Sequence, residues 1–373
     1  MSIRLLLSLF SLLWSPPQVR IPGPGGASAG SSYSYLHEYT LTLGSSAQIP
    51  ATQANFTVLV CANTTLGNGS ACPTQTGLKV TGSGGYVTSS SGYDIAFSST
   101  ACASPTPMGW SMPTYTGSTG AMEAWVRVTS LAAGGTFYVC VGNASITTFQ
   151  GGGSSAWDNN TAGVWHLPNG STLSASDDSS NGNNGNIHST PAGSGQIDGA
   201  ASFSNTSSQY ISIPDAASLE LTSQVTVSAW VNVTAGTNYP MIGAKLTDGG
   251  STGYGLYLNA SGTYFEAQVN STSLESTTAL GTGSWKHIAM TYNGSTLALY
   301  LNGALNTSTS LTGAITTNTN FFGIGTDASL NDFFSGLIDE VHVAGTARSA
   351  NWLLTEYNNQ SAPASFMAIV LTY

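Results

Sequence analysis

The chain has 373 residues, which is enough for two domains of ordinary size that each bury a core of their own. Only 6% of the residues are charged and 41% are hydrophobic, so Ser, Thr, Asn and Gly must supply most of the polar surface. Seven basic residues face seventeen acidic ones, the net charge is −10, and the basic residues form no cluster. This pattern excludes nucleic acid as a partner and argues against an anionic membrane surface, because both are bound by grouped Lys and Arg.

The N-terminus has the pattern of a signal peptide. Arg4 precedes an apolar stretch, Leu5–Trp14, that is too short to span a bilayer, and small residues follow at Ala27–Ala29. The predicted signal peptide is residues 1–29, and the pattern leaves the position of the cut open. The sequence therefore predicts a secreted protein, extracellular or at the cell surface, with no membrane span in the mature chain.

The cysteines also indicate export. All four, Cys61, Cys72, Cys102 and Cys140, lie in the first half of the chain. An even number of cysteines in an exported chain predicts disulfides, and no further Cys or His pair completes a zinc site. Of the three possible pairings we favour Cys61 with Cys72, which closes a hairpin-like excursion, and Cys102 with Cys140, which fixes a loop to a strand.

Short apolar runs bounded by Gly, Asn, Ser and Pro recur along the chain, and this spacing predicts an all-β fold of two β-sandwich domains. One stretch, Ser349–Tyr357, has helical periodicity. The Gly/Ser run at 151–156 predicts a linker between a domain at 31–150, which contains the cysteines, and a domain at 157–360. Residues 361–373 are expected to form a C-terminal strand or tail.

The second half contains a series of motifs in a fixed order. They are Gly163–Leu167, Asp177–Gly185, Gly199–Phe203, Val227–Val231, Trp285–Ala289, Leu297–Gly303 and Gly336–Val341. In this order they resemble the laminin-G-like family of concanavalin A-like lectins and glucanases. The resemblance implies a jelly-roll sandwich that presents loops and a sheet face to ligands, and hence a lectin-like module that binds carbohydrate.

The first half contains three segments, Gly92–Phe97, Ala124–Val128 and Phe137–Asn143, that resemble a bacterial domain family of unknown function. That family commonly precedes laminin-G-like domains in exported proteins. The resemblance implies a β-sandwich here too, and it implies no activity.

No catalytic pair is evident. A glycoside hydrolase needs two carboxylates that face each other across the sugar, and the nearest candidates, Asp339 and Glu340, are neighbours on a strand and are expected to point to opposite faces. Gly249–Gly253 matches a nucleophile-elbow pattern, but a strand and not a helix follows it. The histidines lack the spacing of a zinc helix, and each is expected to be packed or solvated: His166, His188, His287 and His342. The chain is therefore not expected to be an enzyme.

One loop has the pattern of a metal site. Asp177, Ser179 and Asn181 place oxygen side chains at alternate positions next to a glycine, which suits Ca²⁺. The laminin-G-like resemblance implies that Asp339, near the last strand, could join Asp177 and Asn181 at a structural calcium site. The alternative is an Asx-turn loop whose oxygens accept backbone N–H groups.

Strand alternation also suggests a ligand face. If Tyr254, Leu256 and Leu258 point into the core, the opposite face holds a mixture of aromatic and polar groups suited to a sugar: Tyr257, Tyr264, Glu266 and Gln268. The alternative is that these residues only cover the sheet or meet the first domain.

The expected function is therefore extracellular recognition of a glycan or other extracellular polymer, without catalysis. A structural cell-surface, matrix or appendage subunit, with another protein subunit as partner, is the alternative, because Phe366–Leu371 could be a strand without an intramolecular partner. A glycoside hydrolase is the third possibility, supported only by the fold class.

Overall fold

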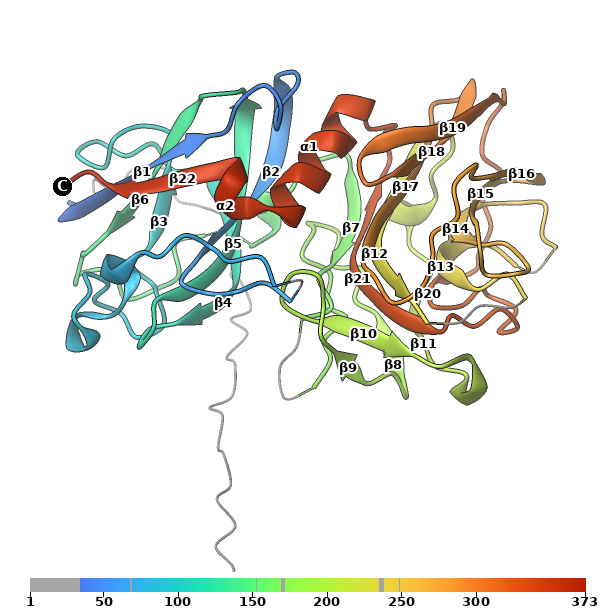
Figure 1. Cartoon of the computed structure of the whole chain (residues 1–373), viewed down its shortest axis with the longest axis horizontal. Coiled ribbons are helices and arrows are strands. Elements are labelled where there is room, and N and C mark those ends of the chain that lie inside the picture. Colours follow the sequence, from blue (N-terminus) through green and yellow to red (C-terminus); the bar gives the residue numbers. More distant parts are fainter. Residues whose placement is uncertain (1–33, 68, 152, 169–171, 235–237, 248) are drawn as a thin grey trace, which may run out of the picture.

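The computed structural model describes residues 34–67, 69–151, 153–168, 172–234, 238–247 and 249–373. The predicted signal peptide lies outside these residues. The chain is almost wholly β, as predicted, and forms two sandwiches that lie side by side along the long axis (Figure 1). We call them module 1 and module 2. Within the described part of the chain, no helix is both long and apolar enough to cross a membrane.

Module 1 packs two antiparallel sheets around one core. One sheet has the order β22 (Met367–Leu371), β1 (His37–Leu43), β6 (Thr136–Val141), β3 (Ala96–Ser98), and the other has the order β2 (Gln53–Ala62), β5 (Ala121–Leu131), β4 (Gly109–Thr116). Alternation along β2 divides its side chains, so that Phe56, Val58 and Val60 enter the core while Leu59 and Cys61 face the other way, toward module 2.

The C-terminal strand corrects one expectation. β22 pairs antiparallel with β1, with Tyr39 opposite Leu371 and Leu43 opposite Met367, so the predicted strand does have an intramolecular partner. Met367 and Ile369 enter the core of module 1. The alternation of these apolar residues suited a strand, but the sequence did not show that the chain returns from module 2 to complete module 1.

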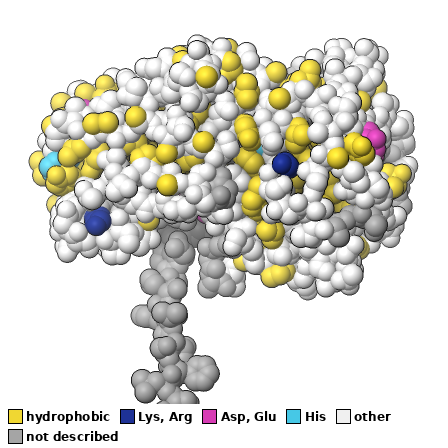
Figure 2. Space-filling model, viewed as in Figure 1, with side chains coloured by type: hydrophobic (Ala, Val, Ile, Leu, Met, Phe, Trp, Pro, Cys, Tyr) yellow, Lys and Arg dark blue, Asp and Glu magenta, His cyan; other side chains and the backbone are white. Residues whose placement is uncertain are grey.

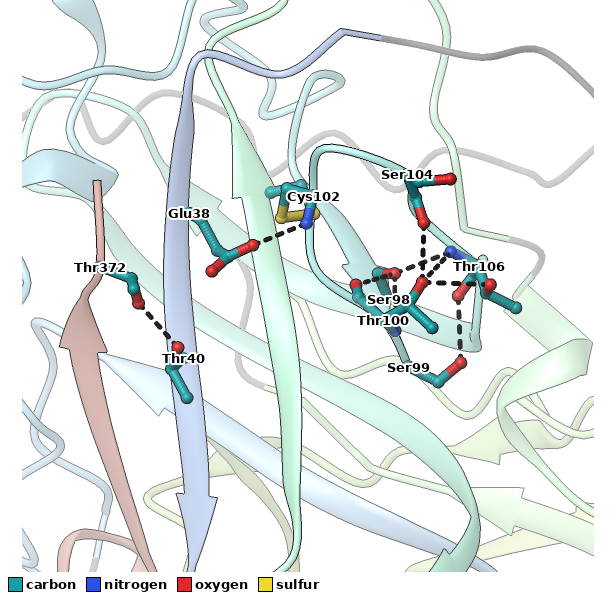
Figure 3. The surroundings of a disulfide bond; sticks show 10 residues. Glu38, Thr40, Ser98, Ser99, Thr100, Cys102, Ser104, Thr106 and Thr372 are labelled. Carbon is teal, nitrogen blue, oxygen red and sulfur yellow. Dashed lines mark hydrogen bonds between the residues drawn. A yellow bond between two sulfur atoms is a disulfide. The ribbon is translucent and has the colours of Figure 1, made fainter.

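Both disulfides join the expected cysteines. Cys61 is bonded to Cys72 and Cys102 to Cys140. At the second bond, a Glu38 carboxylate oxygen accepts a hydrogen bond of 2.6 Å from the Cys102 backbone N–H (Figure 3). The loop that contains Cys102 is thereby held against β1 as well as β6.

Module 2 is a second two-sheet sandwich. The sheet nearer module 1, here called the inner sheet, has the order β19 (Ala304–Ser310), β18 (Thr296–Leu301), β17 (Lys286–Tyr292), β12 (Val225–Val233), β21 (Gly336–Ala344), β10 (Ala200–Phe203), β9 (Ala192–Gly193), with β7 (Thr161–Trp165) also on β21. The outer sheet has the order β16 (Thr272–Glu275), β15 (Phe265–Val269), β14 (Tyr254–Leu258), β13 (Met241–Lys245), β20 (Phe322–Ile324), β11 (Tyr210–Ile213), β8 (Asn186–His188). Every second residue of their central strands enters the shared core.

The outward face of the central strands of the inner sheet is covered. Helix α1 (Ala350–Ser361) lies between the modules (Figure 1), where Leu353 packs against Ala289 and Tyr300. The helix begins where the sequence predicts, because the Ser349 hydroxyl caps the Trp352 N–H at 3.1 Å. A short helix, α2 (Pro363–Phe366), then leads the chain back to module 1.

The Gly/Ser run does not act as a free linker. A 3-10 turn spans Gly153–Ala156, Ala156 is fully buried, and its carbonyl accepts a hydrogen bond of 2.5 Å from the Thr57 hydroxyl. The α1 residue Asn359 also bonds the backbone N–H and C=O of Leu59, at 2.7 and 3.0 Å. The two modules are therefore packed together, because apolar and polar groups on both sides meet at their boundary.

Candidate functional site

The predicted ligand face lies on the outer sheet, but its central tyrosine is not exposed. Tyr254, Leu256 and Leu258 enter the core, as alternation predicts, and Tyr257 points to the other face. Tyr257 is only 4% exposed, because it packs on Met241, Ala244 and Leu246. Its hydroxyl donates to Glu266 Oε2 at 3.1 Å and contacts Ser273 Oγ at 2.9 Å. Tyr257 therefore orients polar groups on this face and offers little ring surface of its own.

The other predicted residues line the same region. Tyr264 is half-buried directly before β15, and the Gln268 side-chain amide donates to the carbonyls of Gly250, at 2.8 Å, and Asn270. In the ladder Gln268 lies opposite Ser273 and Glu266 lies opposite Glu275 on the edge strand β16. Ser273 and Glu275 are exposed, so they place hydrogen-bonding groups at the solvent edge of this face.

An aromatic side chain that strand alternation does not reveal lies over this face. Tyr239 is 43% exposed, and its ring centroid is 6.3 Å from that of Tyr257. Asn238 and Tyr239 both have left-handed φ angles, 67° and 53°, which residues other than glycine rarely adopt. Asn238 is held by Asp332, whose carboxylate accepts its side-chain N–H at 2.7 Å. These contacts fix the exposed ring in place.

The predicted calcium ligands do not share hydrogen-bond partners. The Asp177 carboxylate accepts hydrogen bonds from the N–H groups of Val164, Ser179 and Asn183 at 2.7–2.9 Å, and from the Ser179 hydroxyl at 2.8 Å. The Asn181 amide donates to the Thr161 and Ala162 carbonyls. Asp339 instead accepts from the N–H groups of Gln196 and Ile197. This arrangement favours the Asx-turn alternative for the loop, and calcium at the three residues stays a prediction.

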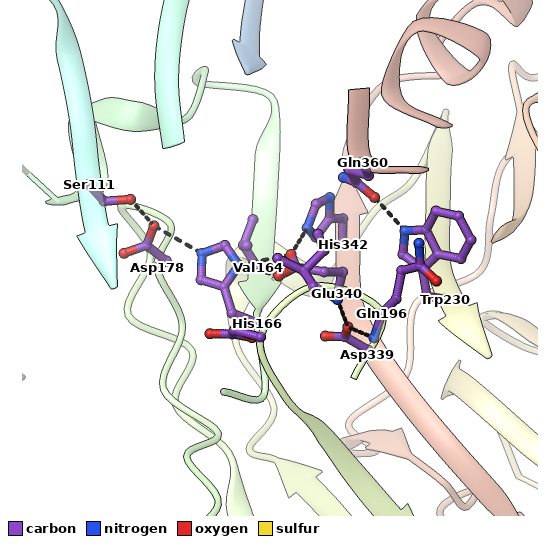
Figure 4. A network of polar contacts seen from close by, with 12 residues as sticks. Ser111, Val164, His166, Asp178, Gln196, Trp230, Asp339, Glu340, His342 and Gln360 are labelled. Atoms are coloured by element: carbon purple, nitrogen blue, oxygen red, sulfur yellow. Dashed lines mark hydrogen bonds and ion pairs between the residues drawn. The ribbon is translucent and has the colours of Figure 1, made fainter. Parts of the chain in front are cut away.

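A second polar cluster lies where the modules meet. Acidic and histidine side chains alternate in a series of contacts, here called the acid–histidine chain: Asp178, His166, Glu340, His342, Glu356 and His287. Figure 4 shows its first four members. His166 Nδ1 is 2.8 Å from Glu340 Oε2, and His342 Nε2 is 2.9 Å from the same oxygen. The spacing of these histidines in the sequence does not predict the cluster, because only the fold brings β7 beside β21.

The ring nitrogens of His166 and His342 that do not contact Glu340 are also paired with carboxylates. His166 Nε2 lies 3.3 Å from Asp178 Oδ2, which in turn accepts hydrogen bonds from the Ser111 hydroxyl of module 1 and the Trp157 indole. His342 Nδ1 lies 3.0 Å from Glu356 Oε1 on α1. The Trp125 ring of module 1 stacks on His166 with centroids 5.0 Å apart. Module 1 and α1 therefore cover most of the acid–histidine chain.

One expectation about Asp339 and Glu340 is wrong. In β21 the pairing with β12 shifts, so that His342 lies opposite Ser228 but Asp339 lies opposite Trp230. Two residues of β21 thus face one of β12, which is a β-bulge, and Glu340 has a left-handed φ of 50°. The bulge breaks the simple alternation of faces. Carboxylate oxygens of Asp198, Asp339 and Glu340 consequently lie within 4.8 Å of one another.

Burial and neighbouring charges shift the pKa values of these groups in different directions. Burial alone lowers the pKa of His166, but the charges and hydrogen bonds of Glu340 and Asp178 more than offset it and hold the pKa well above its usual value. Burial raises the pKa of Glu340, and His166 with His342 outweighs that effect and lowers it. For Asp339 and Asp198 burial and neighbouring carboxylates both raise the pKa well above its usual value.

A cavity of about 40 Å³ adjoins the acid–histidine chain at the module boundary, lined by Trp125 and Phe56 of module 1 and by His342, Glu356 and Trp352 among others. This volume holds roughly one to three waters. It is too small for a sugar, because ligand pockets usually measure roughly 300–1,000 Å³.

Comparison with known proteins agrees with the fold. The sequence model of the concanavalin A-like lectin/glucanases superfamily matches residues 205–353. A search of curated proteins gives no match. Domain 4 of AbnA, a GH43 extracellular arabinanase from Geobacillus stearothermophilus solved with arabinotriose, is 22% identical with a TM-score of 0.44, over 53% of this chain and 98% of that chain.

Two further solved structures are similar over part of their length. The botulinum neurotoxin serotype G binding domain is 16% identical with a TM-score of 0.41, over 53% of this chain and 50% of that chain. A heptameric SAP-like pentraxin from Limulus polyphemus is 17% identical with a TM-score of 0.30, over 38% of this chain and 70% of that chain. By sequence, residues 205–353 are similar to the concanavalin A-like lectin/glucanases superfamily.

Proposed function

We propose that this chain is an extracellular, non-catalytic carbohydrate-binding protein whose glycan site lies on the outer sheet of module 2, between the Tyr239 loop and strand β16. The observation that carries the proposal is the exposed Tyr239 ring, fixed above a face that presents Ser273 and Glu275. A sugar needs a flat apolar surface for its C–H groups and polar partners for its hydroxyls, and this face offers both.

The packing of the modules supports this location. Module 1 and α1 cover the outward face of the central strands of the inner sheet, so a large ligand has no access to that part of the sheet. On the face of the molecule seen in Figure 2, charged side chains are scattered singly among neutral ones, which suits hydrogen bonding to a neutral polymer. The two disulfides agree with an extracellular location.

The proposal that the chain is not an enzyme rests on the burial of its carboxylates. Asp339 and Glu340 do converge, but both are buried, and the adjoining cavity of about 40 Å³ has no room for a glycosidic bond. The alternative of a structural subunit loses the argument from a free C-terminal strand, because β22 is paired with β1.

A glycan array with the purified protein, with and without Ca²⁺, tests the proposal. A positive glycan is then titrated by calorimetry against Tyr239→Ala. Loss of one stacked ring should weaken binding by about tenfold, which corresponds to about 1.4 kcal/mol. Leu305→Ala is the matched control, because Leu305 is 56% exposed but lies on β19 of the inner sheet. This variant should bind the glycan with the affinity of the parent protein.

Two results would contradict the proposal. One is the absence of binding to any glycan by the folded protein. The other is glycan binding that Tyr239→Ala leaves unchanged while Leu305→Ala weakens it, since this would place the site on the inner sheet. Release of reducing sugar from a bound glycan would contradict the non-catalytic part alone.

A further inference from the structure

Three side chains of the acid–histidine chain have the composition of a transition-metal site. His166 Nδ1, a Glu340 carboxylate oxygen and His342 Nε2 lie within 4.8 Å of one another. Two imidazoles with one carboxylate are ligands that zinc accepts, whereas Ca²⁺ prefers oxygen ligands alone. The contacts from Glu340 to the two rings are 2.8 and 2.9 Å, and zinc ligands in a tetrahedron are about 3.3 Å apart. An outward shift of about half an ångström would admit the ion.

The second ring nitrogens are held as they are in protein zinc sites. His166 Nε2 lies 3.3 Å from Asp178, and His342 Nδ1 lies 3.0 Å from Glu356. A metal-bound histidine almost always donates its other N–H to a carboxylate, a backbone carbonyl or water, which fixes the ring and raises its basicity. Here both rings have such a carboxylate, and the two carboxylates come from different elements, the loop after β7 and helix α1.

The backbone at Glu340 gives an independent reason to expect a ligand. Glu340 has a φ of 50° at the bulge of β21, a conformation that costs a residue other than glycine roughly 1–3 kcal/mol. The result of this strain is that the carboxylate lies between the two imidazoles. Strained residues of this kind cluster at ligand sites.

We propose that His166 Nδ1, Glu340 and His342 Nε2 bind one zinc ion, with a water as the fourth ligand. Module 2 supplies all three protein ligands, and module 1 covers them through Trp125. This inference is independent of the glycan site, because that site lies on the other sheet.

The test is a titration of the full chain, stripped of metal with EDTA and dialysed, with Zn²⁺ as the probe. We expect one ion per chain and a melting temperature that rises with Zn²⁺ concentration. Glu356→Gln should weaken binding about 10- to 100-fold, because it removes the carboxylate behind His342. His342→Ala should weaken it more, because it removes a ligand. His188→Ala is the matched control, since His188 lies on β8 and bonds Ser212, and it should bind zinc as the parent protein does.

Circular dichroism and melting in EDTA establish that each variant is folded before the titration. If His342→Ala does not fold, zinc binding by Glu356→Gln and by the parent protein still tests the proposal. The proposal is overturned if the folded parent protein binds no zinc at the level of one ion per chain, or if Glu356→Gln and His188→Ala bind it equally. Co²⁺ in place of Zn²⁺ should give the intense visible absorption of four-coordinate geometry, and a weak octahedral spectrum would also overturn it.

Discussion

The two sheets of module 2 have the same alternation of core and outward residues, yet their outward faces have opposite surroundings. On the inner sheet the outward residue His287 is buried and His342 is mostly buried, under α1 and module 1. On the outer sheet the corresponding face meets solvent at Ser273 and Glu275 and beneath Tyr239. Alternation decides which side chains point outward. The segments that pack on a face decide whether an outward polar group is a binding group or a buried ion.

The energetic consequence is that equal substitutions should have unequal effects on the two sheets. A buried charge that loses its partner keeps its full desolvation cost, whereas an exposed charge is solvated by water. Substitutions of carboxylates and of their partners are therefore the most direct measure of how far the module boundary excludes water.

The largest effect is expected at Glu340. Glu340→Ala removes the carboxylate shared by His166 and His342 and leaves two buried imidazoles without their inner partner. The free energy of unfolding should fall by about 3–5 kcal/mol, the usual cost of breaking a buried ion pair. Urea unfolding in EDTA measures it. Glu275→Ala is the control on the outer sheet and should change stability by less than about 0.5 kcal/mol. A small loss at Glu340, equal to that at Glu275, would show that the boundary is open to water.

The next effect is a pH dependence at His287. Burial lowers the pKa of His287 from its usual 6.5 to about 4, although Glu356 opposes this, and His342 adds to the lowering. The titratable groups that face the His287 ring are Glu356 and Tyr357 of α1 and His342 of β21. Because the unfolded chain binds the proton more tightly, the residue favours folding above pH 6.5 and this contribution is lost as the pH falls toward 4.

Between pH 7 and pH 5 this residue should account for a loss of about 2 kcal/mol. His287→Gln does not titrate, so the parent protein should lose about that much more stability than the variant over this range. The other histidines are common to both proteins and cancel in the difference. Urea unfolding at the two pH values gives the result, and parallel losses in the two proteins would contradict the assignment.

The sequence predicted the sandwiches, both disulfides and α1, because each depends on local pattern: short strand-like runs, an even set of cysteines and helical periodicity over Ser349–Tyr357. It also assigned Tyr257 and Glu266 to one face. It did not predict that β22 joins β1, since pairing between distant strands leaves no local trace.

The buried cluster was missed for a related reason. His166 and Glu340 are 174 positions apart, and their contact requires β7 to pair with β21. The bulge at Glu340 also has no local signal, because glycine and asparagine are the usual residues at a left-handed φ and glutamate is not. The failure of simple alternation at this residue is one reason to look for function there.

A smaller effect is expected at Tyr257 of the outer sheet. Tyr257→Phe keeps the packed ring and removes only the hydroxyl that contacts Glu266 and Ser273. The free energy of unfolding should fall by about 1 kcal/mol, the usual net value of a hydrogen bond. Tyr257→Ala is a poor probe of glycan binding, because the ring is buried and its loss would also leave a cavity. A change above about 3 kcal/mol for Tyr257→Phe would mean that this face is as closed as the inner sheet.

The smallest effect, and the one with opposite sign, is expected at Glu266. Burial raises the pKa of this carboxyl, the Tyr257 hydrogen bond lowers it in part, and the charge of Glu275 raises it further. A folded-state pKa above the unfolded value means that the folded chain keeps the proton longer, so stability falls as pH rises through that window. Glu266→Gln removes the charge but keeps an oxygen that can accept from Tyr257. It should raise stability at pH 7 by less than about 0.5 kcal/mol, and the gain should vanish below about pH 4, where the parent carboxyl is protonated in both states. Melting of the two proteins side by side at pH 7 and pH 3.5 measures the difference, and a clear loss of stability at pH 7 would show that the Glu266 charge has a partner on this face beyond the Tyr257 hydroxyl.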